Sequence, residues 1–525
     1  MPLEAVQRGS IMHGNGDPLS PLYPSKKDLY RTKTIQEAKD DGTLPTIPVL
    51  PLSYNDAYQI LSRMQGRAVP LDWQGGLNIT YRVGPHLSGG ATVRIDVRSS
   101  LQTRLVTIIR NVIGYIHGLD DPDRYVILGN HFDAWVYGSI DPNSGTAVLA
   151  EVARAITQTI SETNWRPART IMFCAWDGEE HGLIGSTEFV EQFANILSQR
   201  AVVYLNVDNI HSNQSMFAST VPTLYQMTTD VAKRIPNPMV AEVRRGRKTV
   251  YDTWIKTFPN EIEFRPDAPR LPVPGAGSDH AAFLNILGIP VVDFTYTNAT
   301  TYDTYPLYHT LYETPFVNEH IFDTNNFAVW VTYVHAAVGQ YWAELAREFT
   351  DSAILPLNIT DFANSLLRIY ARDLKKAIDP LKYYVEPITD AREQLSRLIK
   401  NCQEFLRRAY EFDLVIKRTL QNFAINPFDS RRISLINDRI MSVDRCFINP
   451  RGLPYQPSNR HVLFSASIND SYKGRVMAAI YDQIDAFEAA KTDKQRQLVG
   501  RKLAEQISIV QYSVQCASNT IAKSI

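Results

Sequence analysis

The sequence has no long apolar run, no large excess of charge and no cluster of cysteines, and each absence excludes something. Its apolar runs have the length of strands, well short of the roughly 20 residues that a membrane helix needs, so no membrane segment is expected in this chain. The 54 basic and 55 acidic residues nearly cancel, so no bulk field favours nucleic acid as a partner. The four cysteines form no Cys-x-x-Cys pair, which removes the commonest metal and redox motifs of cysteine.

The chain carries no clear cellular address. Its first residues, MPLEAVQRGS, lack the basic and then apolar pattern of a signal peptide. Cys174 lies inside an apolar strand and is interpreted as a small core residue. A weak indication of a secretory or vacuolar location comes from five Asn-x-Ser/Thr sequons, which begin at Asn78, Asn213, Asn298, Asn358 and Asn469.

A chain of 525 residues is too long for a single hydrophobic core, and changes in composition and periodicity divide it into three parts. Residues 1–105 are rich in Pro, Gly and short β patterns, with one short amphipathic helix over Ser53–Gly66. Residues 106–346 alternate strands with helices, the pattern of a mostly parallel sheet covered by helices. Residues 347–525 consist of long helices. We therefore predict an α/β domain that lies between a partial β-rich domain and a C-terminal helical bundle.

The helices of the last part show clear ends and one apolar seam. Asp390 with Glu393, and Thr492 with Gln495, have the spacing of capping boxes. Apolar residues recur at helical spacing in the last helix, at Leu503, Ile507, Val510, Val514, Ala517 and Ile521. The seam favours packing inside the chain's own bundle, and a bundle that also carries a dimer contact fits it equally well.

Three predicted strands in the middle part end in polar side chains. The run DRYVILGNHFDAWVYGSIDPNSG ends its strand at His131, and Asp133 and Asp141 follow in the loop. The strands in TIMFCAWDGEE and AVVYLNVDN end on carboxylates in the same way. Because ligands collect at the carboxyl ends of a parallel sheet, these side chains predict one shared site.

The residue types at these strand ends suit zinc. The candidate ligands are His131, Asp141, Glu180, Asp208 and His309, and imidazole and carboxylate are ligands that zinc accepts. Two metals about 3.5–4 Å apart need a bridging carboxylate, and the rigid Asp-Pro-Asn-Ser-Gly turn makes Asp141 the natural bridge. Asp133 is expected to accept the second ring hydrogen of His131 and so fix its tautomer.

The adjacent pair Glu179 and Glu180 suggests a division of labour. Neighbouring side chains diverge, so one binds metal while the other faces the water that bridges the metals. Two zinc ions and three carboxylates leave a net charge of about +1, which lowers the pKa of that water and stabilises an oxyanion. Glu179 can then take the proton from the water and hand it to the leaving amine.

Each candidate residue also has an ordinary structural explanation. Glu179 and Glu180 could simply favour the start of the following helix through its dipole. Asp208 alone could be a turn residue, and His309 lies in an aromatic run that suits a core. The joint pattern is what favours a metal centre. Four other histidines have no metal-ligand pattern around them and are interpreted as structural: His181, His211, His280 and His461.

These motifs, in this order and spacing, resemble the glutamate carboxypeptidase II and transferrin receptor-like family of dizinc peptidases. The resemblance is carried by NGDPLSPLYP, DRYVILGNHFDAWVYGSIDPNSG, WDGEEHGLIGSTEFVEQ, YPLYHTLYET and RGLPYQPSNRHVLFS, so it runs nearly from end to end. It implies a catalytic α/β domain, a protease-associated apical domain and a helical dimerisation domain, hence a homodimer. It also implies a secretory, vacuolar or membrane-associated location, and a chain that is shortened at its N-terminus.

The resemblance assigns a role to individual residues. His131, Asp141 and Asp208 would bind one zinc, and Asp141, Glu180 and His309 the other. Glu179 matches the catalytic base, and Tyr308 matches the tyrosine whose hydroxyl supports the tetrahedral intermediate. A structural calcium site of the family falls on Ser20, Tyr23, Glu188 and Glu191, and the two glutamates lie three apart on one helix face.

The substrate pocket departs from the family pattern. Ser471 stands where the family has a lysine before Tyr472, and Ser10 aligns with a pocket asparagine. The family's arginine patch falls on Ala218, Asp293 and Thr295. Bidentate recognition of carboxylates needs those charges, so strict selectivity for glutamate is not expected.

The sequence thus predicts a zinc-dependent exopeptidase that hydrolyses short peptides, of the carboxypeptidase type. An aminopeptidase on the same metal centre is the second hypothesis, because pocket charge decides which end of a peptide is held. A catalytically silent, receptor-like relative is the third, and the complete set of metal ligands with an intact Glu179 argues against it.

Overall fold

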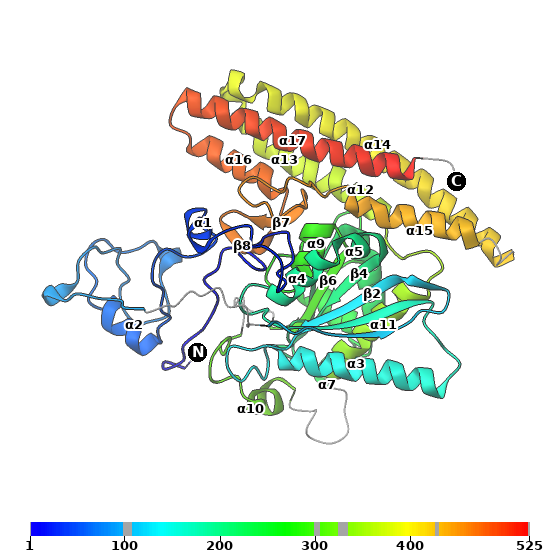
Figure 1. The fold of residues 1–525 in the computed structure, drawn as a ribbon, viewed down its shortest axis with the longest axis horizontal. Helices are drawn as coiled ribbons and strands as arrows, with labels where there is room; N and C mark the ends of the chain where they lie inside the picture. The colour runs from blue at the N-terminus through cyan, green and yellow to red at the C-terminus, as the bar shows by residue number, and fades with distance from the viewer. Residues whose placement is uncertain (1, 98–107, 299–304, 324–333, 426–429, 523–525) are drawn as a thin grey trace.

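The computed structural model describes residues 2–97, 108–298, 305–323, 334–425 and 430–522. Figure 1 shows a central α/β domain, a bundle of long helices along one side of it, and an N-terminal part that extends away from both. Among the described helices, none combines the length and the apolar character needed to cross a membrane.

A six-stranded mixed sheet forms the centre of the α/β domain, with the strand order β1-β3-β2-β4-β6-β5. The pairings β3–β2, β2–β4 and β4–β6 are parallel, whereas the edge strands β1 and β5 run antiparallel to their neighbours. The sheet confirms the predicted α/β class. Its strands are β1 (Val112–Ile116), β2 (Asp121–His131), β3 (Arg169–Trp176), β4 (Ala201–Asn206), β5 (Ser215–Thr220) and β6 (Val291–Thr297).

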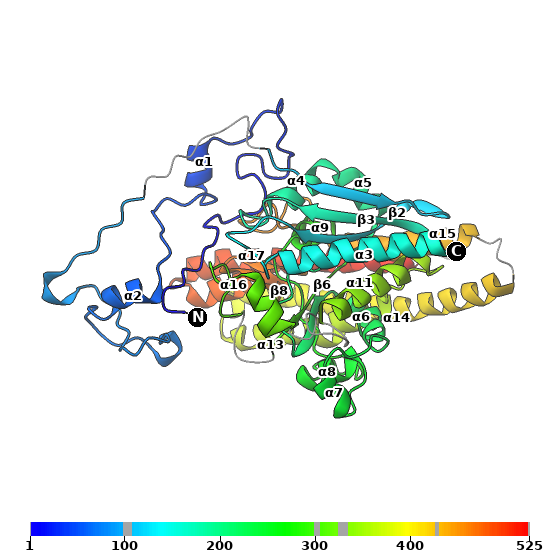
Figure 2. The ribbon, with the colours of Figure 1, turned by 90° about the horizontal axis from the view of Figure 1, so that it is seen from below.

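Helices cover both faces of the sheet. The long helices α3 (Asn143–Glu162) and α11 (Val334–Asp351) pack together on one face, as Figure 2 shows. The other face carries α4 (Ile184–Gln192), α5 (Ala194–Arg200) and α9 (His280–Leu287). The remaining helices of the domain are η3 (Pro222–Leu224), α6 (Tyr225–Ala232), α7 (Val240–Arg244), α8 (Val250–Thr257), α10 (Pro315–Val317) and the π-helix η4 (Asn318–Phe322).

Burial on both faces explains why the central strands are almost wholly apolar. Every residue of β4 is buried, and β2 is buried from Val126 to its end at His131. Such continuous apolar runs are typical of parallel strands that lie between two helical layers. Cys174 lies in β3 with no exposed surface, which confirms its interpretation as a core residue.

The C-terminal part is a helical bundle with a small hairpin inserted. The long helices α14 (Val385–Ile425) and α17 (Asp493–Ile521) pack along each other, as Figure 1 shows. The other elements are α12 (Ile359–Asn364), the π-helix η5 (Ser365–Tyr370), α13 (Ala371–Ile378), η6 (Asp379–Tyr383), α15 (Ser430–Arg445), α16 (Ala478–Ala489), β7 (Phe464–Ser467) and β8 (Asp470–Val476). The whole predicted seam of α17 is buried.

The predicted helix ends are right in one case and wrong in the other. Thr492 and Gln495 form the capping box of α17. Asp390 is no cap, because α14 begins at Val385 and runs through it without a break. Pro387 falls in the first turn of α14, where the missing N–H costs nothing, so the helix can start before it.

A disulfide joins Cys446, just after α15, to Cys516 in α17. The two residues are 70 positions apart in the sequence, and neither lies in a motif that predicts pairing. Cys402 is a free buried thiol of α14.

The N-terminal part differs from the predicted β-rich domain. Residues 2–97 contain the short helices α1 (Ile35–Asp40), α2 (Tyr54–Leu61), η1 (Leu71–Trp73) and η2 (Ser88–Gly90), and two isolated β-bridges in place of strands. Proline and glycine interrupt any longer ladder. Over this described range only two hydrophobic residues, Ala5 and Ala38, are buried, so no apolar layer holds a sheet together. The predicted helix over Ser53–Gly66 is present as α2, with Ser53 as its N-cap.

Candidate metal centre

The sheet register brings the three predicted strand ends together. His131, the last residue of β2, pairs with Trp176 at the end of β3. Gly129 of β2 pairs with Asn206 at the end of β4. The loops that follow β3 and β4 carry Glu179, Glu180 and Asp208, so all of these side chains leave the same edge of the sheet.

A close approach of two backbones fixes the loop of Asp141. Gly145, in the first turn of α3, lies against the segment after β4, and a Cβ there would lie 2.4 Å from the carbonyl oxygen of Asp208. The side chain of Asn130 ties the same place together by donating to the carbonyls of Val207 and Asp208 at 2.9 and 2.8 Å. Glycine is therefore required at position 145, and the helix that follows Asp141 is held next to Asp208.

Asp141 lies between the two histidines. Its Oδ1 is 3.2 Å from Nε2 of His131, and its Oδ2 is 3.5 Å from Nε2 of His309. Asp208 Oδ1 lies 3.3 Å from the same nitrogen of His131, and Glu180 Oε2 lies 3.0 Å from that of His309. Asp141 is therefore within reach of both histidines, the position that a carboxylate shared by two metals would need.

Two groups of these side chains have ligand atoms close enough to hold a metal ion. In each group the ligand atoms lie within 4.8 Å of one another: His131, Glu179 and Asp208 in one, and Asp141, Glu180 and His309 in the other. Glu180 Oε1 is buried and, within the described part of the chain, has no hydrogen-bond partner. Imidazole nitrogens and carboxylate oxygens with a spare buried oxygen fit the donor set of zinc.

The electrostatics of the cluster also favour a cation. Burial raises the pKa of Glu180 to about 7 and that of Glu179 well above its ordinary value. Burial disfavours a charged His309, but the carboxylates of Asp141 and Glu180 prevail and raise its pKa to about 10. Burial also opposes ionisation of Asp141, yet the two histidines outweigh it and lower its pKa. Protons therefore neutralise this buried charge, and a metal that binds here would replace them.

Asp133 has a wider role than the predicted one. The Nδ1 of His131 donates to the backbone carbonyl of Asp133 at 3.0 Å, while the Asp133 carboxylate is 3.6 Å away. That carboxylate instead accepts the backbone N–H groups of Glu179 and Glu180 at 3.0 and 3.3 Å. Asp133 thus leaves Nε2 of His131 free to bind and also fixes the turn that carries the two glutamates.

Ser278 holds Asp208 from behind. Its hydroxyl donates to Asp208 Oδ2 at 2.6 Å and accepts from Nδ2 of Asn206 at 2.9 Å. The same amide nitrogen of Asn206 donates to Asp293 at 2.9 Å. These hydrogen bonds leave Asp208 Oδ1 directed at His131.

The loop of His309 is held by a residue that the sequence did not single out. Glu313 Oε1 accepts the backbone N–H of His309 at 2.7 Å and the hydroxyl of Tyr305 at 2.6 Å. Its Oε2 accepts the backbone N–H of Asp141 at 3.1 Å. Glu313 is 2% exposed, and burial raises its pKa to about 7. The sequence signal was its place in the aromatic run after His309, which did not reveal the contact with Asp141.

The N-terminal part contributes to the same loop. Nδ1 of His309 donates to the backbone carbonyl of Arg8 at 3.0 Å, and the backbone N–H of Arg8 donates to the carbonyl of His309 at 3.1 Å. The carbonyl of Arg8 therefore orients the ring of His309, as that of Asp133 orients His131.

Two aromatic side chains cover the centre. Tyr308 stacks on His309 with ring centroids 3.6 Å apart, and burial together with the nearby Asp141 raises the pKa of its hydroxyl. Trp135, which the sequence did not single out, contacts His181 and His309 at centroid distances of 4.9 and 6.2 Å. A Tyr308 that keeps its proton can donate a hydrogen bond at the centre.

The predicted pocket residues lie near the centre to different degrees. Ser10 follows the Arg8 contact by two residues and accepts the N–H of Met12 at 3.2 Å. Tyr472 is 66% exposed, and partial burial together with the charges of Glu179 and Glu180 raises the pKa of its hydroxyl. The side chain of Ser471 lies outside the described part of the chain.

The positions of the family's arginine patch hold no cation here. Ala218 is buried in β5, and Thr295 of β6 donates to the backbone carbonyl of Asn209 at 2.6 Å. Asp293 puts a carboxyl in this region, and burial raises its pKa.

The predicted calcium residues come together where helix α4 meets a loop of the N-terminal part. Glu188 accepts the backbone N–H of Asp17 at 2.9 Å, and Glu191 accepts that of Leu22 at 2.5 Å. Ser20 is buried and its carbonyl accepts the N–H of Tyr23 at 3.1 Å, so both lie in the loop that these glutamates hold. Burial raises the pKa of Glu191 to about 8, and its Oε2 has no hydrogen-bond partner among the described residues. Two half-buried carboxylates, one of them with a spare oxygen, suit a hard cation such as calcium.

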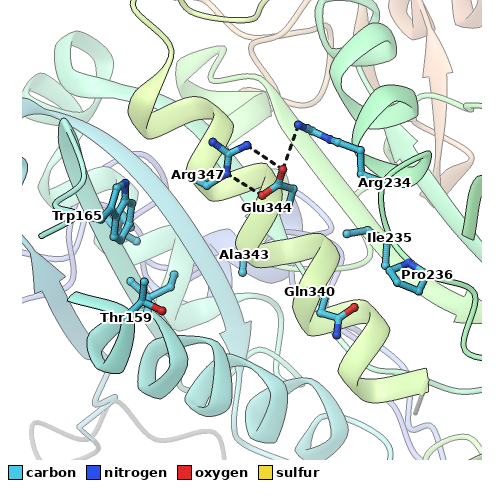
Figure 3. A pocket seen from close by; sticks show the side chains of 11 residues that line it. Thr159, Trp165, Arg234, Ile235, Pro236, Gln340, Ala343, Glu344 and Arg347 are labelled. Atoms are coloured by element: carbon cyan, nitrogen blue, oxygen red, sulfur yellow. Dashed lines mark hydrogen bonds and ion pairs between the residues drawn. The ribbon is translucent and has the colours of Figure 1, made fainter. Parts of the chain in front are cut away.

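A separate cavity of about 540 Å³ lies between α3 and α11. Figure 3 shows Trp165 at one side of it and Arg234, Glu344 and Arg347 at its rim, where the arginines pair with the glutamate. None of the candidate metal ligands lines it. The cavity is therefore distinct from the metal centre.

Two histidines and several carboxylates at the carboxyl edge of a mixed sheet are typical of an α/β metallohydrolase. Residues 111–331 match the family model for Peptidase family M28, and residues 393–522 match that for the transferrin receptor-like dimerisation domain. The chain belongs to peptidase family M28, and the segment that matches the transferrin receptor-like dimerisation domain follows the M28 segment. The resemblance drawn from the motifs is thereby confirmed.

Curated relatives place the chain more closely. It is 54% identical over 524 residues to the Glutamate carboxypeptidase 2 homolog of Caenorhabditis briggsae, which covers 99% of this chain and 66% of that protein. It is 33% identical over 512 residues to Aminopeptidase NAALADL1 of Mus musculus, covering 95% of this chain and 65% of that protein. A solved zinc aminopeptidase from Bacillus subtilis aligns with 45% of this chain and 48% of that one at 20% identity, with a TM-score of 0.32. The chain thus spans about two thirds of the length of its curated relatives.

Proposed function

We propose that the chain is a zinc-dependent exopeptidase that hydrolyses short peptides, with two metals held by residues of the sheet edge. His131, Asp141 and Asp208 would hold one zinc, and Asp141, Glu180 and His309 the other. The observation that carries the proposal is the position of Asp141, whose two oxygens face the two histidines at 3.2 and 3.5 Å. Bound there, two zinc ions would polarise the scissile carbonyl and lower the pKa of a water molecule, so that it can attack the carbonyl as hydroxide.

Glu179 is proposed as the general base. Its side chain is buried beside His131 and Asp208, and Asp133 holds its backbone. Because its pKa is raised by burial, Glu179 can take the proton of the attacking water and pass it to the leaving amine. Tyr308, which stacks on His309, is proposed to donate its hydroxyl hydrogen to the oxyanion that forms.

The carboxypeptidase type is favoured by the relatives. The glutamate carboxypeptidase homologue is 54% identical, against 33% for the aminopeptidase. The pocket supports the aminopeptidase hypothesis, because Ser10 stands in place of the family's pocket asparagine and Asp293 stands in place of one of its arginines. An acidic side chain near the substrate suits a free amine better than a carboxylate, so the two hypotheses differ in the peptide end that they require.

One experiment tests the function and separates the two types. Zinc per chain is measured, and a library of dipeptides with free or blocked ends is hydrolysed by wild type, Glu179→Gln and the control Glu151→Gln. Glu151 is an exposed glutamate of α3 that pairs with Arg154 and belongs to neither group of candidate metal ligands, so it receives the same chemical change outside the centre. We expect about two zincs in each protein and a loss of about 10²–10⁴-fold in kcat for Glu179→Gln alone.

Other results contradict the proposal. A wild-type protein that holds no zinc, or a Glu179→Gln variant as active as wild type, refutes the metal-assisted mechanism. A requirement for a free carboxyl end supports the carboxypeptidase type, and a requirement for a free amino end supports the aminopeptidase type. A metal-loaded wild type that hydrolyses nothing supports the receptor-like hypothesis.

We propose further that the protein is a homodimer through its helical part and that it follows a secretory route. Tyr410 and Leu414 lie one turn apart on α14 and are 48% and 51% exposed, inside the segment that matches the dimerisation domain. Sedimentation of wild type and Leu414→Lys tests the dimer, since a charge on this apolar face would shift the protein towards monomer. The disulfide between Cys446 and Cys516 supports an oxidising compartment.

A structural calcium ion at Glu188 and Glu191 is also proposed. The loop of Ser20 and Tyr23 against these glutamates supports it, together with the spare oxygen of Glu191.

A further inference from the structure

Glu313 links the two loops that carry the ligands of one proposed metal site. One oxygen of its carboxylate accepts the backbone N–H of His309 at 2.7 Å, and the other accepts the backbone N–H of Asp141 at 3.1 Å. The hydroxyl of Tyr305 gives the carboxylate a third donor at 2.6 Å. The side chain of Glu313 therefore touches the main chain of both ligands, and none of these bonds uses a ligand atom.

The loop of His309 needs such a support. The backbone of His309 has φ +58°, in the left-handed region that costs a residue with a Cβ about 1 kcal/mol or more. Neighbouring structure has to hold a residue in that conformation. Glu313 does so from one side through the N–H of His309, while the carbonyl of Arg8 accepts from its ring on the other side.

The loop of Asp141 is joined to the same support. Ile140, Tyr305 and Val317 form a small buried cluster that is separate from the main core. The backbone N–H of Ser139 also donates to the carbonyl of Glu313 at 3.2 Å. Residues 139–141 and the loop around His309 are thus packed and hydrogen-bonded as one unit, with Glu313 at the junction.

We propose that Glu313 is a positioning residue that sets the metal affinity of the site formed by Asp141, Glu180 and His309. It acts by fixing the spacing between the loops of Asp141 and His309, whose side chains approach to 3.5 Å. The inference rests on the proposed metal function. Outer partners of metal ligands typically change metal affinity or activity by about 10–100-fold when they are replaced.

The two oxygens of Glu313 allow its hydrogen bond to Asp141 to be removed separately from its hydrogen bond to His309. In Glu313→Gln the amide oxygen can replace Oε1 and keep the bonds from His309 and Tyr305, which both donate to that atom. The amide NH₂ would then face the N–H of Asp141, and two donors repel. The variant therefore loses the hydrogen bond from Asp141 and keeps the packing of the side chain. Tyr305→Phe removes the hydroxyl donor and leaves both backbone bonds in place.

The test compares wild type, Glu313→Gln, Tyr305→Phe and the surface control Glu151→Gln. Zinc binding is measured by competition with a chromophoric chelator, and the cobalt-substituted proteins are compared by their visible absorption spectra. For Glu313→Gln we expect one of the two ions to bind about 10–100-fold more weakly, with a changed cobalt spectrum. Tyr305→Phe and Glu151→Gln should bind both ions as wild type does. Thermal unfolding of each metal-free protein shows that the fold is intact.

The outcomes separate this inference from the proposed function. A wild type that binds no zinc overturns both. A wild type that binds two ions, with a Glu313→Gln variant that binds them equally tightly and has the same spectrum, overturns the role of Glu313 alone. If Glu313→Gln fails to fold, Glu313→Asp replaces it, because its carboxylate is one methylene too short to reach both loops. An unchanged metal affinity in Glu313→Asp then overturns the proposal.

Discussion

His461 makes the stability of the protein depend on pH in a way that can be worked out from its contacts. The side chain has no exposed surface, and its Nδ1 accepts the backbone N–H groups of Leu463 and Phe464 at 3.2 and 3.1 Å. The ring also stacks against Phe447 and Phe464. An Nδ1 that accepts two hydrogen bonds cannot carry a proton, and burial lowers the pKa of His461 to about 3.

The sign of the effect follows from the two states. In the unfolded chain the same histidine has a pKa of about 6.5. Between pH 6.5 and pH 3 the unfolded state therefore binds more protons than the folded state, so stability falls as the pH falls through this range. Above pH 6.5 the contribution of His461 is complete. One pH unit below 6.5, it has dropped by about 1.4 kcal/mol.

The substitution His461→Asn isolates this contribution. The amide oxygen of asparagine can accept the same two backbone N–H groups, but it does not titrate. Urea unfolding of wild type and variant is followed by the helical circular dichroism signal at pH 7.5 and 5.5. We expect the stability advantage of wild type over the variant to shrink by about 1.4 kcal/mol between the two pH values.

The comparison can refute the reasoning directly. If the two proteins lose stability in parallel between pH 7.5 and 5.5, His461 is not neutral in the folded state. An advantage of wild type that grows at low pH would mean that the folded histidine takes up a proton, contrary to its two acceptor bonds. The difference between two proteins matters here, because other groups that titrate in this range contribute equally to both.

Two further predictions concern the bundle and the metal centre. Replacing both Cys446 and Cys516 by serine should lower the free energy of unfolding by about 4 kcal/mol on the chain-entropy account of a 70-residue loop, as measured by urea unfolding. A reductant should lower the stability of wild type and leave that of the double variant unchanged. A wild type whose stability does not respond to reductant contradicts the presence of the disulfide. Ser278→Ala removes the hydroxyl that donates to Asp208, and should weaken zinc binding at one site about tenfold. Chelator competition measures this, and loss at the Asp141–Glu180–His309 site instead would contradict the assignment.

Much of the site could be predicted because its residues follow strong local patterns. Three buried strands have long apolar runs, and polar residues stand at or just after the end of each, where a parallel sheet must place them on the same edge. The bridging role predicted for Asp141 rests on its rigid turn and on the carboxylate that two neighbouring metals need, and in the structure its two oxygens face the two histidines. The seam of α17 was readable for the same reason, because helical spacing shows which face is buried.

The features that were missed depend on contacts between distant residues. Glu313 looks like any glutamate of a loop until the loop meets Asp141, 172 residues earlier in the chain. Cys446 and Cys516 have no motif, and only the packing of two helices brings them together. Asp133 was expected to use its carboxylate on His131, but its own carbonyl lies closer. Local patterns set the strands and helices, whereas these pairs are set by tertiary packing.

The contact between Arg8 and His309 joins residues 301 positions apart, and it is made by the main chain of Arg8. A scan that replaces side chains with alanine would pass over this position, because every residue except proline keeps the N–H and every residue keeps the carbonyl. Such a non-local contact costs loop entropy when its two ends are brought together, and this cost grows only slowly with their separation. The ring orientation of one candidate ligand thus depends on the path of the main chain in the N-terminal part, and side-chain identity at position 8 has no part in it.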